Sequence, residues 1–243
     1  MPNDNGGSGK HIARRFADMS SDELAGHLEG MDKEDLREAA NALTERVREL
    51  ERTVTHDDLT KLLNKKGFTE EVKRAAAETQ RGFIDQEKLG GIFNQEAAAE
   101  VPLYFMAYID LNDFKPINDT HGHDAGDKIL QTVADKLRDI LRPSDKASAA
   151  RIGGDEFAFL ISVDAVDDIA AIETRLHQEL DCIETAYGDH MLQCGASIGF
   201  RNLFVNSEDT PDKLAEINLK CADGNMYRDK ERIKSRDPCT SSR

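Results

Sequence analysis

Hydrophobic and polar residues follow two different periods along this chain, which predict strands in some segments and helices in others. A nearly continuous apolar run at Leu103–Ile109, with aromatic and β-branched members, indicates a central buried strand. Two more apolar runs, Ala147–Ile152 and Phe157–Val163, flank the pair Gly153-Gly154. Because glycine accepts the positive φ angles of short turns, this arrangement predicts a β-hairpin. The alternating segment Met191–Phe200 predicts one further strand.

Apolar residues at helical spacing occupy the segments around these strands. They predict helices at about Lys66–Thr79, along the apolar face Ile129–Ile140, at Asp167–Tyr187 and at Leu214–Ile233. The order strand, helix, hairpin, helix, strand, helix predicts an α+β fold with an antiparallel-containing central sheet and flanking helices, close to the ferredoxin-like pattern. We expect the stretch Arg81–Glu100 to be an irregular surface insertion, whose role the sequence leaves open.

Residues 1–55 are expected to form a separate N-terminal helical segment, ahead of a domain at residues 56–243. A short helix is predicted from Ser20 to about Met31, and a longer one opens near Asp32. The apolar residues of the longer helix alternate spacings of four and three: Leu36, Ala40, Leu43, Val47, Leu50 and Val54. The seam suits an amphipathic helix folded back on its own domain or a short dimerising coiled coil. It contains fewer than three full heptads, so both interpretations stay open.

Composition excludes several classes of protein. The formal charge of −15 argues against non-specific nucleic-acid binding, which needs a basic face, although metal ions and local lysines still permit a nucleotide ligand. The longest apolar run, near Val101–Ile109, is too short for a membrane segment, and Met1–Gly9 has no apolar signal core. Four widely spaced cysteines indicate reduced thiols. We therefore expect a soluble cytoplasmic protein.

Acidic residues follow two of the predicted strands. Asp110 ends the first strand, at the kind of position where open α/β sheets bind ligands, although an Asp there can also cap the next helix. Asp155 and Glu156 directly follow the Gly153-Gly154 turn. Such a hairpin tip can be acidic for solubility alone. It can also present carboxylates to a metal, beside a glycine backbone that a ligand can approach closely.

The stretch Gly153-Gly154-Asp155-Glu156-Phe157 is identical to the motif of the GGDEF domain, so the chain resembles diguanylate cyclases, which condense two GTP into cyclic di-GMP. Residues 57–65 resemble the family's Asp-x-Leu-Thr-Gly-Leu-x-Asn-Arg motif, with Lys61 and Lys65 as departures. The residues taken to match are Asp58, Leu59, Thr60, Leu62 and Asn64. Residues 110–119 and 122–127 also resemble family motifs, and the resemblance covers about residues 57–234.

This resemblance implies a nucleotidyltransferase that depends on Mg²⁺ or Mn²⁺. Asp110 and Asp155 are the expected metal ligands, and the family pattern adds the backbone carbonyl of Leu111. Magnesium prefers few protein carboxylates and completes its octahedron with phosphate and water. Such ions neutralise phosphates and activate the attacking hydroxyl. The resemblance also brings Glu156 into the site, either as a ligand of a second metal or in activating the hydroxyl, and the sequence does not separate these roles.

The resemblance further implies that Asn118 and Asp127 recognise guanine, with His123 nearby, which favours GTP over ATP. A metal cluster of His121, His123 and Asp124 is the competing interpretation, but its spacing is not a standard zinc pattern.

Positive charge for the phosphates is expected from lysine side chains. Lys115 can add charge in the transition state, and Lys230 and Lys234 lie four residues apart on one helical face. Arginine is frequent in the family where Lys234 stands, so the bidentate geometry of a guanidinium is lost. The backbone of Gly153 and Gly154 completes the expected substrate-binding set.

Many diguanylate cyclases carry an Arg-x-x-Asp site for product inhibition, which begins nine residues before the hairpin glycines. Its charged positions are Ser144 and Ala147 here, so this inhibition is predicted to be missing.

The leading hypothesis is an active homodimeric cyclase that binds GTP. The alternative is a catalytically silent module that binds GTP or c-di-GMP, against which the intact Asp110, Asp155 and Glu156 argue. A cyclase that makes a monomeric cyclic nucleotide is disfavoured by the hairpin motif.

Overall fold

The computed structural model of this 243-residue chain describes residues 33–88, 102–140, 147–163 and 166–235. The chain divides into two compact units, Met1–Val54 and Thr55–Arg243. Helix α3 (Lys33–Thr55) provides what is described of the first unit, and it carries the apolar seam. The predicted helix from Ser20 to Met31 lies outside the described residues. Within the described part of the chain, no helix is long and apolar enough to cross a membrane.

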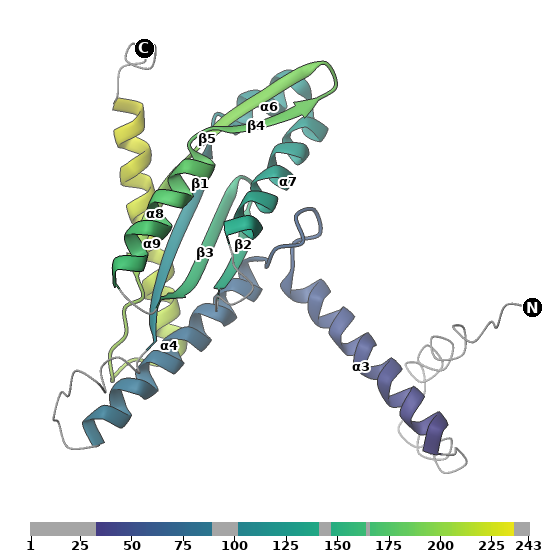
Figure 1. Cartoon of the computed structure of the whole chain (residues 1–243), viewed down its shortest axis with the longest axis vertical. Helices are drawn as coiled ribbons and strands as arrows, with labels where there is room; N and C mark the ends of the chain where they lie inside the picture. Colours follow the sequence, from purple (N-terminus) through teal and green to yellow (C-terminus); the bar gives the residue numbers. More distant parts are fainter. Residues whose placement is uncertain (1–32, 89–101, 141–146, 164–165, 236–243) are drawn as a thin grey trace, which may run out of the picture. The chain divides into compact units, whose positions relative to one another are not determined.

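The second unit is built on a five-stranded sheet in the order β2-β3-β1-β5-β4 (Figure 1). The strands are β1 (Leu103–Asn112), β2 (Ala147–Gly153), β3 (Glu156–Val163), β4 (Ile183–Tyr187) and β5 (His190–Asn202). Every neighbouring pair is antiparallel. The predicted α+β class with an antiparallel-containing sheet is therefore confirmed.

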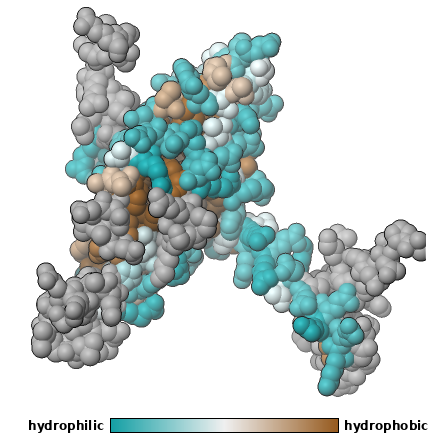
Figure 2. Space-filling model, in the orientation of Figure 1, coloured by the Kyte–Doolittle hydropathy of each residue, from teal (hydrophilic) through white to brown (hydrophobic). Residues whose placement is uncertain are grey.

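Helices cover both faces of this sheet. They are α4 (Lys65–Lys88), α6 (Phe114–His121), α7 (His123–Ile140), α8 (Val166–Leu180) and α9 (Pro211–Ser235). Helices α4 and α9 pack on one face, and α7 and α8 on the other. On the face that Figure 2 shows, most of the coloured surface is hydrophilic, and hydrophobic atoms gather in the middle of the second unit.

Alternate residues of β1 belong to the two cores on opposite faces of the sheet. Phe105 and Ile109 pack with residues of α7 and α8, whereas Met106 and Tyr108 pack with residues of α4 and α9. Because both faces are covered, the strand is apolar along almost its whole length. Asp110 follows Met106 and Tyr108 at the strand's period of two, so it faces α9.

Two sequence predictions about secondary structure were wrong. The helix predicted over Asp167–Tyr187 ends at Leu180, and Ile183–Tyr187 forms β4, paired with β5. The buried Ile183 and Thr185 alternate with exposed residues, which is a strand pattern too short to stand out after a helix. The expected irregular stretch Arg81–Glu100 is helical as far as Lys88 in α4, and residues 89–101 lie outside the described residues.

A close approach between α9 and β5 fixes the position of α9 over the sheet. A Cβ atom at Gly199 of β5 would lie 2.1 Å from the backbone nitrogen of Met226 in α9. Glycine is required there because any side chain would push the helix away. This contact holds the second half of α9, which includes Asp223 and Lys230, beside the end of β1 where Asp110 lies.

Candidate active site

The turn between β2 and β3 contains the central residues Gly154 and Asp155, with Gly153 paired to Glu156. Gly154 has φ +51°, at the position where type II′ hairpin turns need glycine. The β2–β3 register shifts between Arg151 and Gly153, an irregularity of the kind found next to active sites. The Leu111 amide donates to the Asp155 carbonyl at 3.2 Å. The acidic turn is therefore held against the end of β1.

The β1–β3 register sets Asp110 directly opposite Glu156. Residues opposite each other in an antiparallel pair project from the same face, so the two carboxylates are neighbours. Burial raises the pKa of Glu156, and the charges of Asp110, Asp223 and Asp155 raise it further. The hydroxyl of Tyr108 donates to Glu156 Oε2 at 3.4 Å, and this hydrogen bond lowers the pKa of Glu156 in part. Three aspartate carboxylates thus lie close enough to Glu156 to affect its charge at this end of the sheet.

Helix α9 brings a cation to this acidic group. The Lys230 ammonium forms an ion pair with Asp110 Oδ1. The Asp110 side chain is 11% exposed and that of Lys230 is 29% exposed, so the pair lies at the edge of the buried interior. Lys234 follows one turn later in α9, but its side chain lies outside the described residues.

The oxygen-rich donor set around Asp110 and Asp155 fits Mg²⁺ or Mn²⁺, which prefer carboxylate, carbonyl and phosphate oxygens. Leu111 follows Asp110 directly, and its side chain is buried in the core. Among the described residues, no three His, Cys, Asp or Glu side chains converge as a preformed metal centre. An ion at this site would therefore take further ligands from nucleotide phosphates and water. The alternative cluster of His121, His123 and Asp124 is not assembled either.

A second cluster lies where α6 meets α7. Asn118 Oδ1 is buried, and it has no hydrogen-bond partner among the described residues. A Cβ atom at Gly126 would lie 2.0 Å from this oxygen, so glycine makes the room that the Asn118 amide occupies. His123 and Asp127, both exposed, stand in the first turns of α7 beside it. An unpaired buried acceptor is costly, so Asn118 Oδ1 is a candidate acceptor for a donor on a bound ligand or water.

The start of α6 offers backbone donors close to β1. Its N-cap residue, Asp113, has φ +59° and makes no side-chain cap hydrogen bond. The first amides of a helix have no intrahelical acceptor, so those of Phe114 and Lys115 remain available to an anion. The Lys115 side chain is exposed on this first turn.

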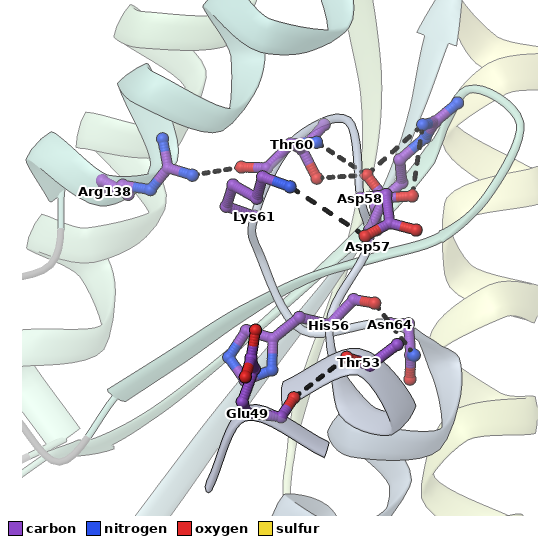
Figure 3. Close-up of polar contacts among 10 residues, drawn as sticks. Glu49, Thr53, His56, Asp57, Asp58, Thr60, Lys61, Asn64 and Arg138 are labelled. Atoms are coloured by element: carbon purple, nitrogen blue, oxygen red, sulfur yellow. Dashed lines mark hydrogen bonds and ion pairs between the residues drawn. The ribbon is translucent and has the colours of Figure 1, made fainter. Parts of the chain in front are cut away.

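The loop His56–Asn64, called the junction loop below, contacts the strand that leads into the hairpin. Asp57 Oδ1 accepts from the Thr60 amide at 2.8 Å and from the Thr60 hydroxyl at 2.6 Å, as Figure 3 shows. Arg151 of β2 pairs with the same Asp57 carboxylate, and Arg138 donates to the Thr60 carbonyl. The Asp58 side chain is 99% exposed. Asp57, two residues before Leu59, is therefore the Asp of the family motif, and the match to Asp58 was wrong.

Tyr108 and Asp223 are not among the site residues predicted from the sequence, although simple spacing points to both. Tyr108 is two residues before Asp110 on a strand, so the two side chains share a face. Asp223 is seven residues before Lys230 on α9, two helical turns away on the same side. Both lie near Glu156, whose pKa responds to each of them.

The family model described as "Diguanylate cyclase, GGDEF domain" matches residues 54–236. MucR of Pseudomonas aeruginosa, a bifunctional diguanylate cyclase/cyclic di-GMP phosphodiesterase, is 31% identical over 79% of this chain and 24% of its own length. The diguanylate cyclase DgcN of Escherichia coli is 30% identical over 75% of this chain and 38% of its own length. The chain thus spans well under half of these relatives.

Solved structures agree with this assignment. A sensory box/GGDEF family protein from Caulobacter crescentus shares 30% identity, with a TM-score of 0.55 over 73% of this chain and 99% of the other. The GGDEF domain of DgcB from the same organism, solved with c-di-GMP, shares 26% identity, with a TM-score of 0.56 over 73% of this chain and 90% of the other. Because the family model covers residues 54–236, most of the sequence, the chain belongs to the GGDEF domain family of diguanylate cyclases.

Proposed function

We propose that this protein is a diguanylate cyclase that joins two GTP molecules into cyclic di-GMP and releases two pyrophosphates. The observation that carries the proposal is the cross-strand pair Asp110 and Glu156, with Asp155 in the turn held against the same strand end. The catalytic domain would comprise residues 56–243, and residues 1–55 would be an N-terminal helical segment. We place the enzyme in the cytoplasm, the compartment that its widely spaced cysteines predict.

The acidic residues would hold a divalent cation, Mg²⁺ or Mn²⁺, through Asp110, Asp155 and the backbone carbonyl of Leu111. Such an ion neutralises phosphate charge and makes a ribose hydroxyl a better nucleophile. Glu156 would act beside it, as a further metal ligand or as the acceptor of the proton from the 3′-hydroxyl. The raised pKa of Glu156 is consistent with either role, because each relieves the crowding of negative charge.

Guanine would be recognised between α6 and α7. Guanine carries an N1–H and an exocyclic amine on one edge, and both need acceptors. The unpaired Asn118 Oδ1 supplies one acceptor and the Asp127 carboxylate can supply the other, with His123 at the rim. Adenine does not offer two donors in this arrangement, so we expect a preference for GTP.

The triphosphate would lie between the hairpin turn and α9. Cβ atoms built at Gly153 and Gly154 would have no neighbour within 4 Å, so there is open space beside the turn. Lys230, Lys234 and Lys115 would supply positive charge, and the free amides at the start of α6 would add donors. These groups would fix the α-phosphate and leave the pyrophosphate stabilised as it departs.

The reaction needs two copies of the chain. The 3′-oxygen of one GTP attacks the α-phosphorus of the other, pyrophosphate leaves, and the reciprocal attack closes the ring. We therefore propose a homodimer that α3 holds together. In support, the seam residues Val47 and Leu50 are each 52% exposed. Burying such a stripe against a second copy is the usual way in which a heptad pattern is stabilised.

Incubation of the purified chain with GTP and Mg²⁺, followed by chromatography of the products, tests this function. Cyclic di-GMP and pyrophosphate are the expected products. Retained GTP binding without any product would contradict the proposal and would support the silent binding module instead. A monomeric cyclic nucleotide as product would show a different cyclase.

A further inference from the structure

Lys230 occupies a position in the acidic site that the phosphate-binding role does not explain. Its ammonium is paired with Asp110 Oδ1, on the residue proposed to hold the metal. It reaches this carboxylate from α9, 120 residues away in the sequence. The contact is therefore a product of the tertiary fold.

Asp110 needs a cation in the absence of metal. Its side chain is 11% exposed and stands opposite Glu156. Asp223 and Asp155 lie close enough to Glu156 to raise its pKa, so further negative charge surrounds the pair. A buried carboxylate among other carboxylates is strongly unfavourable unless a positive charge compensates it. Lys230 supplies that charge from a flexible side chain that keeps partial access to solvent.

We propose that Lys230 is the counter-ion of Asp110 in the metal-free site, and that the divalent ion must displace it from the Asp110 carboxylate. The displaced ammonium then pairs with the nucleotide triphosphate. This inference rests on the proposed function for the identity of the ion and of the nucleotide. The step beyond that function is that Lys230 exchanges the Asp110 carboxylate for the triphosphate.

The exchange couples the two binding events. Metal binding without nucleotide breaks the ion pair of Lys230 with Asp110 and gives the ammonium no phosphate in exchange. Nucleotide binding without metal takes Lys230 away from Asp110. Each ligand removes the cost of the other, so each must strengthen the binding of the other by the same factor. The site would then bind free metal ions weakly until a triphosphate arrives.

The test is a calorimetric titration of the full chain with Mn²⁺ in the absence of nucleotide. Lys230→Met should bind Mn²⁺ about tenfold more tightly than the wild type, because the competing ammonium is gone. Lys220→Met is the matched control: Lys220 is exposed on the same helix, and its loss changes the net charge equally. This control should bind Mn²⁺ as the wild type does, and Asp110→Asn should lose the binding.

A second set of titrations includes a non-hydrolysable GTP analogue. The analogue should increase Mn²⁺ affinity by a larger factor in the wild type than in Lys230→Met, because only the wild type has an ammonium to transfer. Unchanged or weaker Mn²⁺ binding by Lys230→Met would overturn the proposal, and so would an equal gain in Lys220→Met, which would indicate a general charge effect. If Lys230→Met does not fold, Lys230→Gln, which keeps a donor for Asp110, takes its place.

Thermal unfolding gives an independent readout. Without metal, Lys230→Met should melt below the wild type, since Asp110 is left buried and unpaired, and Mn²⁺ should raise its midpoint more than that of the wild type. These measurements involve no turnover. A wild-type protein that makes no cyclic di-GMP would refute the proposed function and leave the Mn²⁺ result interpretable. An active enzyme whose Mn²⁺ affinity is the same with and without the Lys230 ammonium would refute only this inference.

Discussion

Arg151 and Asp57 form an ion pair at 3.3 Å, which joins the junction loop to the strand before the hairpin. The Arg151 Nε also donates to the Gly154 carbonyl at 2.9 Å. One guanidinium thus connects the start of the domain to the turn that carries Asp155. Its planar fork of donors suits two acceptors at once, which a lysine at this position would not satisfy.

Loss of the Asp57 charge is expected to destabilise the protein. Burial tends to raise the pKa of Asp57, but hydrogen bonds from Thr60 and the charge of Arg151 outweigh it and hold the pKa below its usual value. Asp57→Asn should lower the free energy of unfolding by about 1–3 kcal/mol near neutral pH. Because the folded-state pKa is depressed, this contribution is present above the unfolded-state pKa of about 3.9 and is lost as pH falls through the lower folded value.

Urea denaturation at neutral pH and again below about pH 3 measures this effect. The difference between wild type and Asp57→Asn should shrink in acid. Asp58→Asn is the control, because that side chain is 99% exposed and should have no measurable effect. Equal stability of the two variants would contradict the role of the ion pair.

Asp155→Ala is expected to abolish cyclic di-GMP synthesis and leave stability within about 0.5 kcal/mol, since it removes a ligand from a surface turn and no core volume. The chain provides a matched control at its other hairpin. Gly188 has φ +58° and precedes Asp189, just as Gly154 has φ +51° and precedes Asp155. Asp189→Ala should keep wild-type activity. Initial rates and unfolding curves of both variants check this, and comparable rates for the two would contradict the role of Asp155.

Gly126→Ala is expected to weaken nucleotide binding, because its Cβ would lie 2.0 Å from Asn118 Oδ1 and force that amide out of position. The Kd for a GTP analogue should rise by about tenfold, the effect of losing a hydrogen bond to a buried acceptor. The control is Gly224→Ala, where a Cβ meets no atom within 4 Å. That change should leave binding intact and add about 0.5–1 kcal/mol of helix stability. Unaltered binding by Gly126→Ala would exclude Asn118 from the site.

Charges on the α3 seam are expected to dissociate the proposed dimer. Val47→Glu combined with Leu50→Glu places two like charges where the two helices would meet, and each residue is 52% exposed in the single chain. Analytical ultracentrifugation should show a monomer, and the rate of product formation should fall with it. Asn41→Glu adds charge on the face of α3 away from the seam and should remain dimeric. A doubly substituted protein that still sediments as the wild type would exclude this seam.

Product inhibition is expected to be weak. Ser144 and Ala147 stand at the spacing where the Arg-x-x-Asp site has its charged residues, and the charged pair Arg142 and Asp145 of this chain stands two residues earlier, out of that spacing. Titration of the initial rate with cyclic di-GMP should show little loss of activity. Ser144→Arg with Ala147→Asp should introduce the inhibition. Strong inhibition of the unmodified chain at low product concentration would contradict the prediction.

Much of the fold could be predicted from the sequence, because long patterns dominate it. The buried run of β1 and the glycine pair of the hairpin each determine a local structure on their own. The strand β4 could not be distinguished, since its five residues follow a helix and only pairing with β5 makes them a strand. The ion pair of Lys230 with Asp110 could not be predicted from the sequence either, because it depends on how α9 crosses the sheet at Gly199.

The β1 strand is hydrogen-bonded on both edges, to β3 and to β5. Inserting or deleting one residue between Leu103 and Asp110 would turn every later side chain to the opposite face. The acid would then enter the apolar layer under α7, and Ile109 or Leu111 would face α9. An inserted or deleted residue is consequently tolerable at the tip of the β4–β5 hairpin and not inside β1. The number of residues between Leu103 and Asp110 is therefore tightly constrained.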